Sequence, residues 1–387
     1  MEVHTIMQTL ITNATLVMED HYIPEAALLI RDGQIADFGP ENALDIPTDA
    51  KRLDAHGALV GPGLIDIHTH AGGNVFFQED PITASEALLD HGVTGVLPAL
   101  YMTLSKQGYF EAIDKIDAAR RSGKCGNILG YYMEGPYLNP SYGCNREDYA
   151  WGDDIDREDY MDLVERVRDS ARVWAVAPER AGIEEFVKDV RQRIPNIVFT
   201  VAHSEATPRQ IAALMPYGLR LATHHTNATG TLNRYPECRG VCVDEAVNYY
   251  DGIYAELIVD AHGIHVDPFM LRLVRKIKGD ARIILISDAF VSNGPIPPGY
   301  DGVTDINFDF SGEIAGTRLT LDAVCRNMMK HTGCSPVDAF KFASTSPANL
   351  LKMPKLGRIA RGAEASLVVA DSWMNIEHVI LKGEIVR

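Results

Sequence analysis

The chain has 387 residues, 46% of them hydrophobic, and a formal net charge of −17 at pH 7. This length supplies enough core for a large barrel domain. The acidic balance argues against binding to nucleic acid or to anionic membranes, because both present negative phosphates. No apolar run approaches the roughly 20 residues that span a bilayer, and the first residues lack the basic and then apolar order of a signal peptide. We therefore expect a cytoplasmic protein.

The two ends of the chain share a β-rich pattern. Residues 1–58 contain the runs LITNATLV and AALLIRDGQIADFG, in which Asp32-Gly33 is a hairpin signal. Residues 353–387 contain ASLVVAD and HVILKGEIVR, with a turn at Lys382-Gly383. Because both ends differ from the middle, we expect 1–58 and 353–387 to form one small β-sandwich domain around a second domain at 59–352.

The middle of the chain alternates apolar strand runs with helical patterns. Amphipathic stretches such as YFEAIDKIDAARRS and REDYMDLVERVRDS separate the strands. This alternation predicts a closed (β/α)₈ barrel of the TIM type. A doubly wound open sheet is the alternative, although no glycine-rich phosphate fingerprint follows a strand. The eight strand candidates are 64–70, 93–100, 128–134, 172–179, 197–204, 220–227, 254–260 and 282–289.

Residue types that bind metals end five of these strands. In chain order they are His68 and His70, Glu134, His203, His224 and Asp288. Residues two apart in a strand face the same side, so His68 and His70 share a face. Barrel enzymes place their catalytic groups at the carboxyl ends of the strands. We therefore expect all six side chains to meet in one pocket.

Imidazoles and carboxylates in one pocket suit a divalent cation. The set fits zinc or iron, and it is large enough for two ions that share one carboxylate. Such a cation lowers the pKa of a bound water toward ~7 and polarises an amide carbonyl. We expect one or two divalent ions, zinc first, with iron, cobalt or manganese as alternatives.

At these residues the chain resembles the amidohydrolase superfamily and, within it, the N-acetylglucosamine-6-phosphate deacetylase branch. The resemblance covers nearly the whole chain. Its segments are GPGLIDIHTHAGG (61–73), YMEGPYLNP (132–140), AHSEAT (202–207), THHTNATG (223–230), GIHVDP (263–268), SDA (287–289) and LGRIARGAEASLVVAD (356–371).

The resemblance implies a role for each position. Glu134, His203 and His224 resemble the ligands of the metal present throughout the branch. His68 and His70 resemble ligands of a second metal, which Glu134 would bridge. Asp288 resembles the catalytic acid/base, also within the metal group, and His265 resembles the group that binds the substrate and supports its developing oxyanion.

The substrate positions depart from the family pattern. Asn227 and the backbone N–H of Ala228 resemble the phosphate-contacting pair. The stretch SYGCNRED places Cys144 near the position where the family carries a phosphate-reaching histidine from a neighbouring subunit. Arg234 or Arg239, in NRYPECRG, is the expected clamp for the anion. His262 competes with His265 for the role facing the substrate.

The resemblance implies a deacetylase that acts on an N-acetylhexosamine 6-phosphate and releases acetate. The alternative is an amidohydrolase that deacylates a different N-acyl substrate, with or without a phosphate. A third hypothesis is a catalytically silent homologue that uses the barrel for binding. The expected partner is a small N-acetylated amino sugar, and a homodimer is expected by family analogy.

Overall fold

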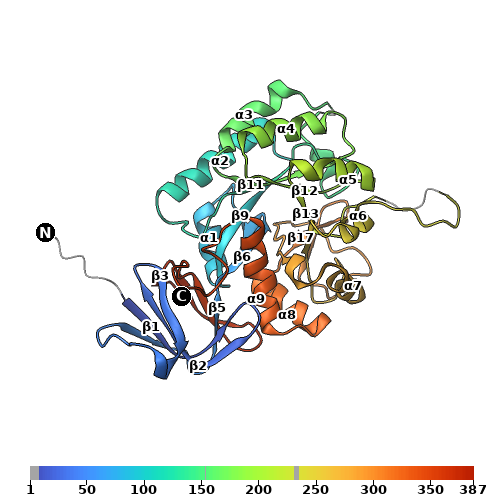
Figure 1. Cartoon of the computed structure of the whole chain (residues 1–387). Helices are drawn as coiled ribbons and strands as arrows, with labels where there is room; N and C mark the ends of the chain where they lie inside the picture. Colours follow the sequence, from blue (N-terminus) through green and yellow to red (C-terminus); the bar gives the residue numbers. More distant parts are fainter. Residues whose placement is uncertain (1–7, 153, 231–234) are drawn as a thin grey trace.

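Eight parallel strands from the middle of the chain lie side by side in one sheet (Figure 1). The computed structural model describes residues 8–152, 154–230 and 235–387. The strand order is β15-β14-β13-β12-β11-β10-β9-β6, so each strand pairs with its neighbours in the chain. These strands are β6 (Leu64–Thr69), β9 (Val93–Tyr101), β10 (Tyr131–Glu134), β11 (Ala171–Val176), β12 (Val198–Val201), β13 (Leu219–Ala222), β14 (Tyr254–Leu257) and β15 (Ile283–Leu285).

The segment after the last strand bonds back to the first strand. The backbone N–H of Asp288 donates to the carbonyl of His68 at 3.0 Å, and that of His70 donates to the carbonyl of Ala289 at 2.9 Å. A doubly wound sheet would reverse its strand order at a switch point, which this sheet does not do. The predicted barrel is therefore confirmed, and the open-sheet alternative is wrong.

Helices between the strands cover the outside of the barrel (Figure 1). Their bounds are α1 (Pro81–Leu89), α2 (Lys106–Arg121), α3 (Arg157–Val167), α4 (Ile183–Arg193), α5 (Pro208–Leu214), α6 (Val243–Tyr249), α7 (Pro268–Lys278), α8 (Leu321–Thr332), α9 (Pro336–Phe340) and α10 (Ser346–Leu350). Alternation along each strand separates two cores. In β11, Trp174 packs among helix residues such as Phe186, whereas Val173 and Ala175 pack inside the barrel.

The two ends of the chain form one small mixed sheet beside the barrel. Its path is β20-β19-β18-β5-β1-β2-β3, with β4 paired to β1. The strands are β1 (Gln8–Val17), β2 (Tyr22–Arg31), β3 (Gln34–Pro40), β4 (Lys51–Asp54), β5 (Leu59–Pro62), β18 (Leu367–Ala370), β19 (Ile376–Leu381) and β20 (Glu384–Ile385). The expected turn at Asp32-Gly33 is present, with φ of 49° and 75°. Because β5 joins this sheet, the sheet extends past residue 58; the division of the chain into two domains remains a prediction.

Two short hairpins lie near the carboxyl ends of the barrel strands. β7 (Ala71–Gly72) pairs with β8 (Val75–Phe76), and β16 (Ile306–Phe308) pairs with β17 (Ile314–Thr317). The second hairpin follows the proline-rich stretch 295–302 and is tied to the barrel, because Thr317 N–H donates to the carbonyl of Asp288 at 2.9 Å. Within the described ranges, no helix has the length and apolar character needed to cross a membrane.

Candidate metal centre

The six predicted ligand residues lie together at the carboxyl ends of the strands, and all are buried. His68 lies in β6 and Glu134 ends β10, but the other strands stop earlier than the sequence pattern predicts. His203, His224 and Asp288 follow β12, β13 and β15, and each has a positive φ, of 42°, 29° and 46°. Such left-handed backbone is rare for residues with a side chain, and it clusters at functional sites.

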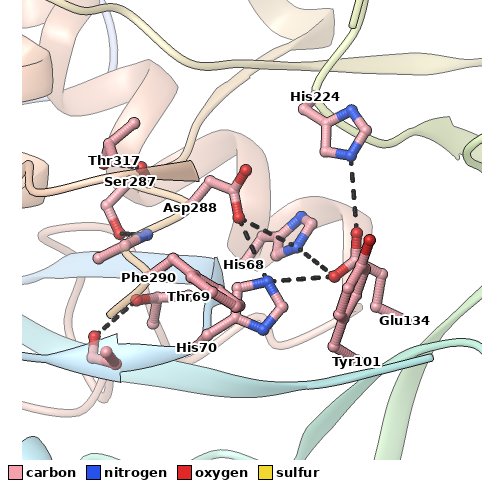
Figure 2. Close-up of polar contacts among 12 residues, drawn as sticks. His68, Thr69, His70, Tyr101, Glu134, His224, Ser287, Asp288, Phe290 and Thr317 are labelled. Carbon is pink, nitrogen blue, oxygen red and sulfur yellow. Dashed lines mark hydrogen bonds and ion pairs between the residues drawn. The ribbon is translucent and has the colours of Figure 1, made fainter. Parts of the chain in front are cut away.

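The ligand atoms form two groups that share one carboxylate. One group is His68, His70 and Asp288, the other is Glu134, His203 and His224, and within each group the ligand atoms lie within 4.8 Å of one another. Glu134 directs Oε1 to His203 Nε2, at 3.2 Å, and Oε2 to His70 Nε2, at 3.1 Å. Figure 2 shows this carboxylate facing His70 and His68 on one side and His224 on the other. Glu134 therefore has the geometry of a bridge between two sites.

Two buried polar atoms at this centre make no hydrogen bond, and a bound cation would be a partner for them. His68 Nε2 and Glu134 Oε2 are buried and make no hydrogen bond, although Oε2 lies 3.1 Å from His70 Nε2 and 3.4 Å from His68 Nε2. The Nε2 atoms of His203 and His224 lie 3.2 Å apart. Buried polar atoms without partners cost free energy, and a divalent cation bound by nitrogen and carboxylate ligands removes that cost. The residues present therefore fit one or two such cations.

Both carboxylates of the centre are held in the charged form. Burial works to raise the pKa of Glu134, but the charge of His68 and hydrogen bonds with His203 and His224 outweigh it and hold that pKa well below its usual range. Burial likewise works to raise the pKa of Asp288, and the His68 and His70 imidazoles lower it instead. Anionic carboxylates are the form that ligates metals.

Glu256 is a functional candidate that the motif analysis missed. This β14 residue is fully buried, and its Oε2 lies 3.1 Å from His68 Nδ1. It also accepts hydrogen bonds from the Tyr132 hydroxyl, at 3.3 Å, and from the His224 N–H, at 3.2 Å. A carboxylate on Nδ1 fixes the ring and would leave Nε2 free to bind a metal. The sequence carried one signal for this residue, a glutamate in the interior of the apolar strand run YAELIVD.

A loop that follows β10 orients His203. The carbonyl of Tyr142 lies 3.2 Å from His203 Nδ1, which leaves Nε2 directed at Glu134. Gly143 has a φ of 93°, and a Cβ there would lie 2.3 Å from the same Nδ1. The loop therefore needs glycine at this position in order to pack against the imidazole.

A cavity of about 330 Å³ opens above the centre. Five of the six predicted ligands line it, as do the predicted substrate residues Asn227, Ala228 and His265. His265 is held by Asp260, whose Oδ2 lies 3.4 Å from Nδ1 and accepts the backbone N–H of His265 at 2.8 Å. The structure thus places His265 where it can meet a substrate.

The other predicted substrate residues do not enter this cavity. His262 is exposed and lies outside the lining, whereas His265 is buried and lines the cavity. Arg239 is 74% exposed, pairs with Glu245 of α6 at 2.9 Å and is not among the lining residues. Arg234 lies outside the described residues. Among the described residues that line the cavity, none is lysine or arginine.

Comparison with known proteins identifies the class. The Amidohydrolase family model matches residues 59–386, so the chain belongs to the amidohydrolase family. The predicted resemblance is confirmed, and the protein is a hydrolase that acts on amide carbon–nitrogen bonds. The family implies a divalent metal, for which the two groups are the candidate ligands.

Individual relatives are named as deacetylases of phosphorylated amino sugars. The chain is 30% identical to an N-acetylgalactosamine-6-phosphate deacetylase of Escherichia coli O157:H7, over 96% of this chain and 97% of that protein. It is 27% identical to an N-acetylglucosamine-6-phosphate deacetylase of Lysinibacillus sphaericus, over 98% of both chains. The crystal structure of N-acetylglucosamine-6-phosphate deacetylase from Pasteurella multocida matches with a TM-score of 0.84 and 25% identity, covering 98% of this chain and 99% of the other.

Proposed function

We propose that the protein removes the acetyl group from an N-acetylhexosamine 6-phosphate and releases acetate and the free amine. The observation that carries this proposal is the Glu134 carboxylate, shared by two groups of ligands at the floor of an open cavity. The named activities of the relatives support the substrate class. N-acetylglucosamine 6-phosphate is the first candidate, and its galacto isomer is the second.

The residues present would hold one or two divalent ions, zinc first, with iron, cobalt or manganese as alternatives. His68, His70 and Asp288 would hold one ion, and His203 and His224 the other, with Glu134 common to both. A bound cation of this kind acidifies water and polarises the amide carbonyl. Both groups are complete, which favours two ions over one.

Asp288 and His265 would act on the substrate directly. Asp288 lines the cavity, and its Oδ1 lies 3.3 Å from His70 Nε2; the neighbouring imidazoles lower the pKa of this carboxyl group against the effect of burial. Its carboxylate would accept the proton of the attacking water and deliver it to the amine nitrogen as the carbon–nitrogen bond breaks. His265 would hydrogen-bond to the carbonyl oxygen and support the negative charge that develops there.

The sugar phosphate would lie at the side of the cavity formed by Asn227 and Ala228. The side-chain amide of Asn227 donates a hydrogen bond to the His224 carbonyl at 3.3 Å, which connects this side of the cavity to the metal centre. Arg234 would supply the positive charge that the described lining lacks. We do not assign that role to Arg239, because it is paired with Glu245.

A second candidate function is deacylation of an unphosphorylated N-acyl compound. It is favoured by the absence of lysine and arginine among the described lining residues. The test is acetate release by the zinc-loaded protein from N-acetylglucosamine 6-phosphate, N-acetylgalactosamine 6-phosphate and the two unphosphorylated sugars. We expect a preference of at least tenfold for one phosphorylated sugar. Equal or better turnover of an unphosphorylated sugar would favour the second function.

Two other hypotheses have direct tests. A catalytically silent homologue would purify without a transition metal and would gain no activity when metal is added, whereas we expect bound metal and activity. The homodimer is a proposal by family analogy, and light scattering after size exclusion would test it. A mass of 42.6 kDa would mean a monomer.

A further inference from the structure

A second cavity adjoins the one above the metal centre. It has a volume of about 350 Å³ and lies on the side of Phe76, Asn145 and Phe310. Three residues line both cavities: His70, Tyr101 and Phe290. One candidate metal ligand and two aromatic side chains therefore form the wall between the two spaces.

The aromatic part of this wall touches the ligand imidazole. The Phe290 ring packs edge-on against His70, with centroids 5.2 Å apart, and Tyr101 packs against the same imidazole at 5.7 Å. Phe76 supports Phe290 from the far side at 4.9 Å. Figure 2 shows Phe290 and Tyr101 beside His70. This corner is an apolar part of the cavity, and it contacts a predicted ligand directly.

Hydrogen bonds fix the wall in place. The Phe290 N–H donates to the Thr317 carbonyl at 2.9 Å, and the Asn307 side chain donates to the Phe290 carbonyl at 2.6 Å. The Tyr101 hydroxyl donates to the Cys144 carbonyl at 3.1 Å. Two hairpin residues thus hold the backbone of Phe290, and one loop residue holds the Tyr101 hydroxyl, so both residues of the wall are anchored.

We propose that Phe290, backed by Tyr101, is the residue that limits the acyl group to about the size of acetyl. This inference rests on the proposed function. In the proposed binding mode the amide carbonyl lies beside the ligand side chains and His265, and the sugar lies on the side of Asn227; all of these positions line the first cavity. The alkyl group of the acyl carbon then points to the apolar corner, where Phe290 closes the way into the second cavity.

The test compares N-acetyl, N-butanoyl and N-hexanoyl glucosamine 6-phosphate in the zinc-loaded protein and in Phe290→Ala. The wild type should lose at least about tenfold in kcat/KM from acetyl to butanoyl, because a methylene that does not fit a hydrophobic pocket costs about 10- to 200-fold. In Phe290→Ala the ratio of hexanoyl to acetyl should rise at least tenfold. An unchanged ratio in a folded variant with wild-type metal content would overturn the proposal.

Two further variants keep this test decisive. Phe310→Ala changes a residue that lines the second cavity alone and is 78% exposed, so it should keep the wild-type chain-length profile. Phe290→Leu keeps an apolar side chain if the alanine variant does not fold, and it should shift the ratio in the same direction by a smaller factor. A shift in Phe310→Ala equal to that in Phe290→Ala would remove Phe290 from its assigned role.

The binding of free carboxylic acids tests the role of Phe290 without an assay of sugar hydrolysis. Calorimetry would compare acetate with hexanoate on the zinc-loaded wild type and on Phe290→Ala. We expect the wild type to bind acetate at least tenfold more tightly than hexanoate, and the variant to lose that preference. If the wild type hydrolyses none of the sugars, the proposed function fails, while identical acetate and hexanoate profiles in the two proteins would refute the acyl wall.

Discussion

Asp288 faces the His70 imidazole at 3.3 Å and lines the cavity, so it is placed to exchange a proton with a bound substrate. Asp288→Asn keeps the shape of the side chain but removes its ability to accept a proton. We expect kcat to fall about 10²- to 10⁴-fold, the usual contribution of a positioned acid/base. Metal content, measured by mass spectrometry, should not fall below one equivalent, because Glu134, His203 and His224 still hold the other ion. Wild-type turnover in this variant would show that Asp288 does not transfer the proton.

Glu256 makes a separate prediction about metal affinity. Its carboxylate holds His68 Nδ1 and the His224 backbone, so Glu256→Ala should weaken metal binding about 10- to 100-fold, as the loss of an outer partner of a ligand does. Competition with a chelator measures this affinity without any assay of activity. Tyr132→Phe is the matched control, because it removes one hydroxyl from Glu256 and leaves the bond to His68. Wild-type affinity in Glu256→Ala would contradict the account.

At the scale of residues, the sequence predicted which side chains meet at the metal centre. The carboxyl ends of the parallel strands of a barrel lie on the same side. Residue type and position in the strand were therefore enough to predict that five side chains meet there: His68, His70, Glu134, His203 and His224. Loops follow no such rule. The turn geometry that exposes His262 and the ion pair that holds Arg239 depend on contacts that no sequence spacing encodes.

The β16–β17 hairpin approaches the centre through one glycine. A Cβ at Gly316, which has a φ of 63°, would lie 2.5 Å from the Asp288 carbonyl oxygen and 2.9 Å from Phe290 Cβ. Gly316→Ala should lower the free energy of unfolding by more than the roughly 1–2 kcal/mol that left-handed backbone alone costs a residue with a side chain. Denaturant unfolding measures the difference.

Gly312 provides the control for this substitution. Its φ is 85°, but its nearest neighbour across space is the Pro297 side chain, at 3.5 Å. Gly312→Ala should therefore carry the backbone cost alone. Equal losses of stability in the two variants would show that the close approach at Asp288 is not what requires glycine in β17.

His91, in the turn that follows α1, joins this part of the barrel to α8. Its Nδ1 lies 3.3 Å from Asp322 of α8, and this contact raises the pKa of His91. The charge of Asp90 raises the pKa further, whereas burial and the charge of Arg326 lower it by less. Because the folded pKa lies above the unfolded value of about 6.5, this stabilisation is full below that pH and is lost as pH rises through the folded pKa. His91 is 42% exposed, so solvent screening limits the gain to about 0.2–1 kcal/mol.

Unfolding of His91→Gln and the wild type at several pH values tests this link. The wild type should be more stable at pH 6, and the difference should disappear by about pH 9. The bond between Arg326 and Asp322, at 3.0 Å, remains in both proteins and acts as an internal control. A difference that grows with pH would contradict the assigned sign.

At the scale of elements, periodic segments were predictable and short ones were not. The 3.6-residue pattern of 109–122 and 157–170 predicted α2 and α3, because each presents one apolar face to the barrel. Strands of two to four residues such as β7, β8, β16 and β17 carry no period to detect. The strand ends were also placed too late, because His203, His224 and Asp288 leave the strand conformation to face the cavity.

At the scale of the whole molecule, the chain forms a closed barrel, and the residues of its metal centre come from the first strand, the last strand and strands between them. His68 and His70 come with the first strand, Asp288 with the last, and Glu134, His203 and His224 lie between them. The centre therefore forms only when the barrel is complete. The alternation of strands and helices predicted this architecture, and the small sheet from both chain ends was predicted from composition and turn signals alone.

The most direct test of the central claim is acetate release during metal reconstitution. The chain would be stripped with a chelator, dialysed and given zinc in steps of half an equivalent, with N-acetylglucosamine 6-phosphate and its galacto isomer as substrates. We predict negligible release from the stripped protein, and release that rises with added zinc and levels off at one or two equivalents. Release by the stripped protein at the rate of the reconstituted one would contradict a metal-dependent deacetylase.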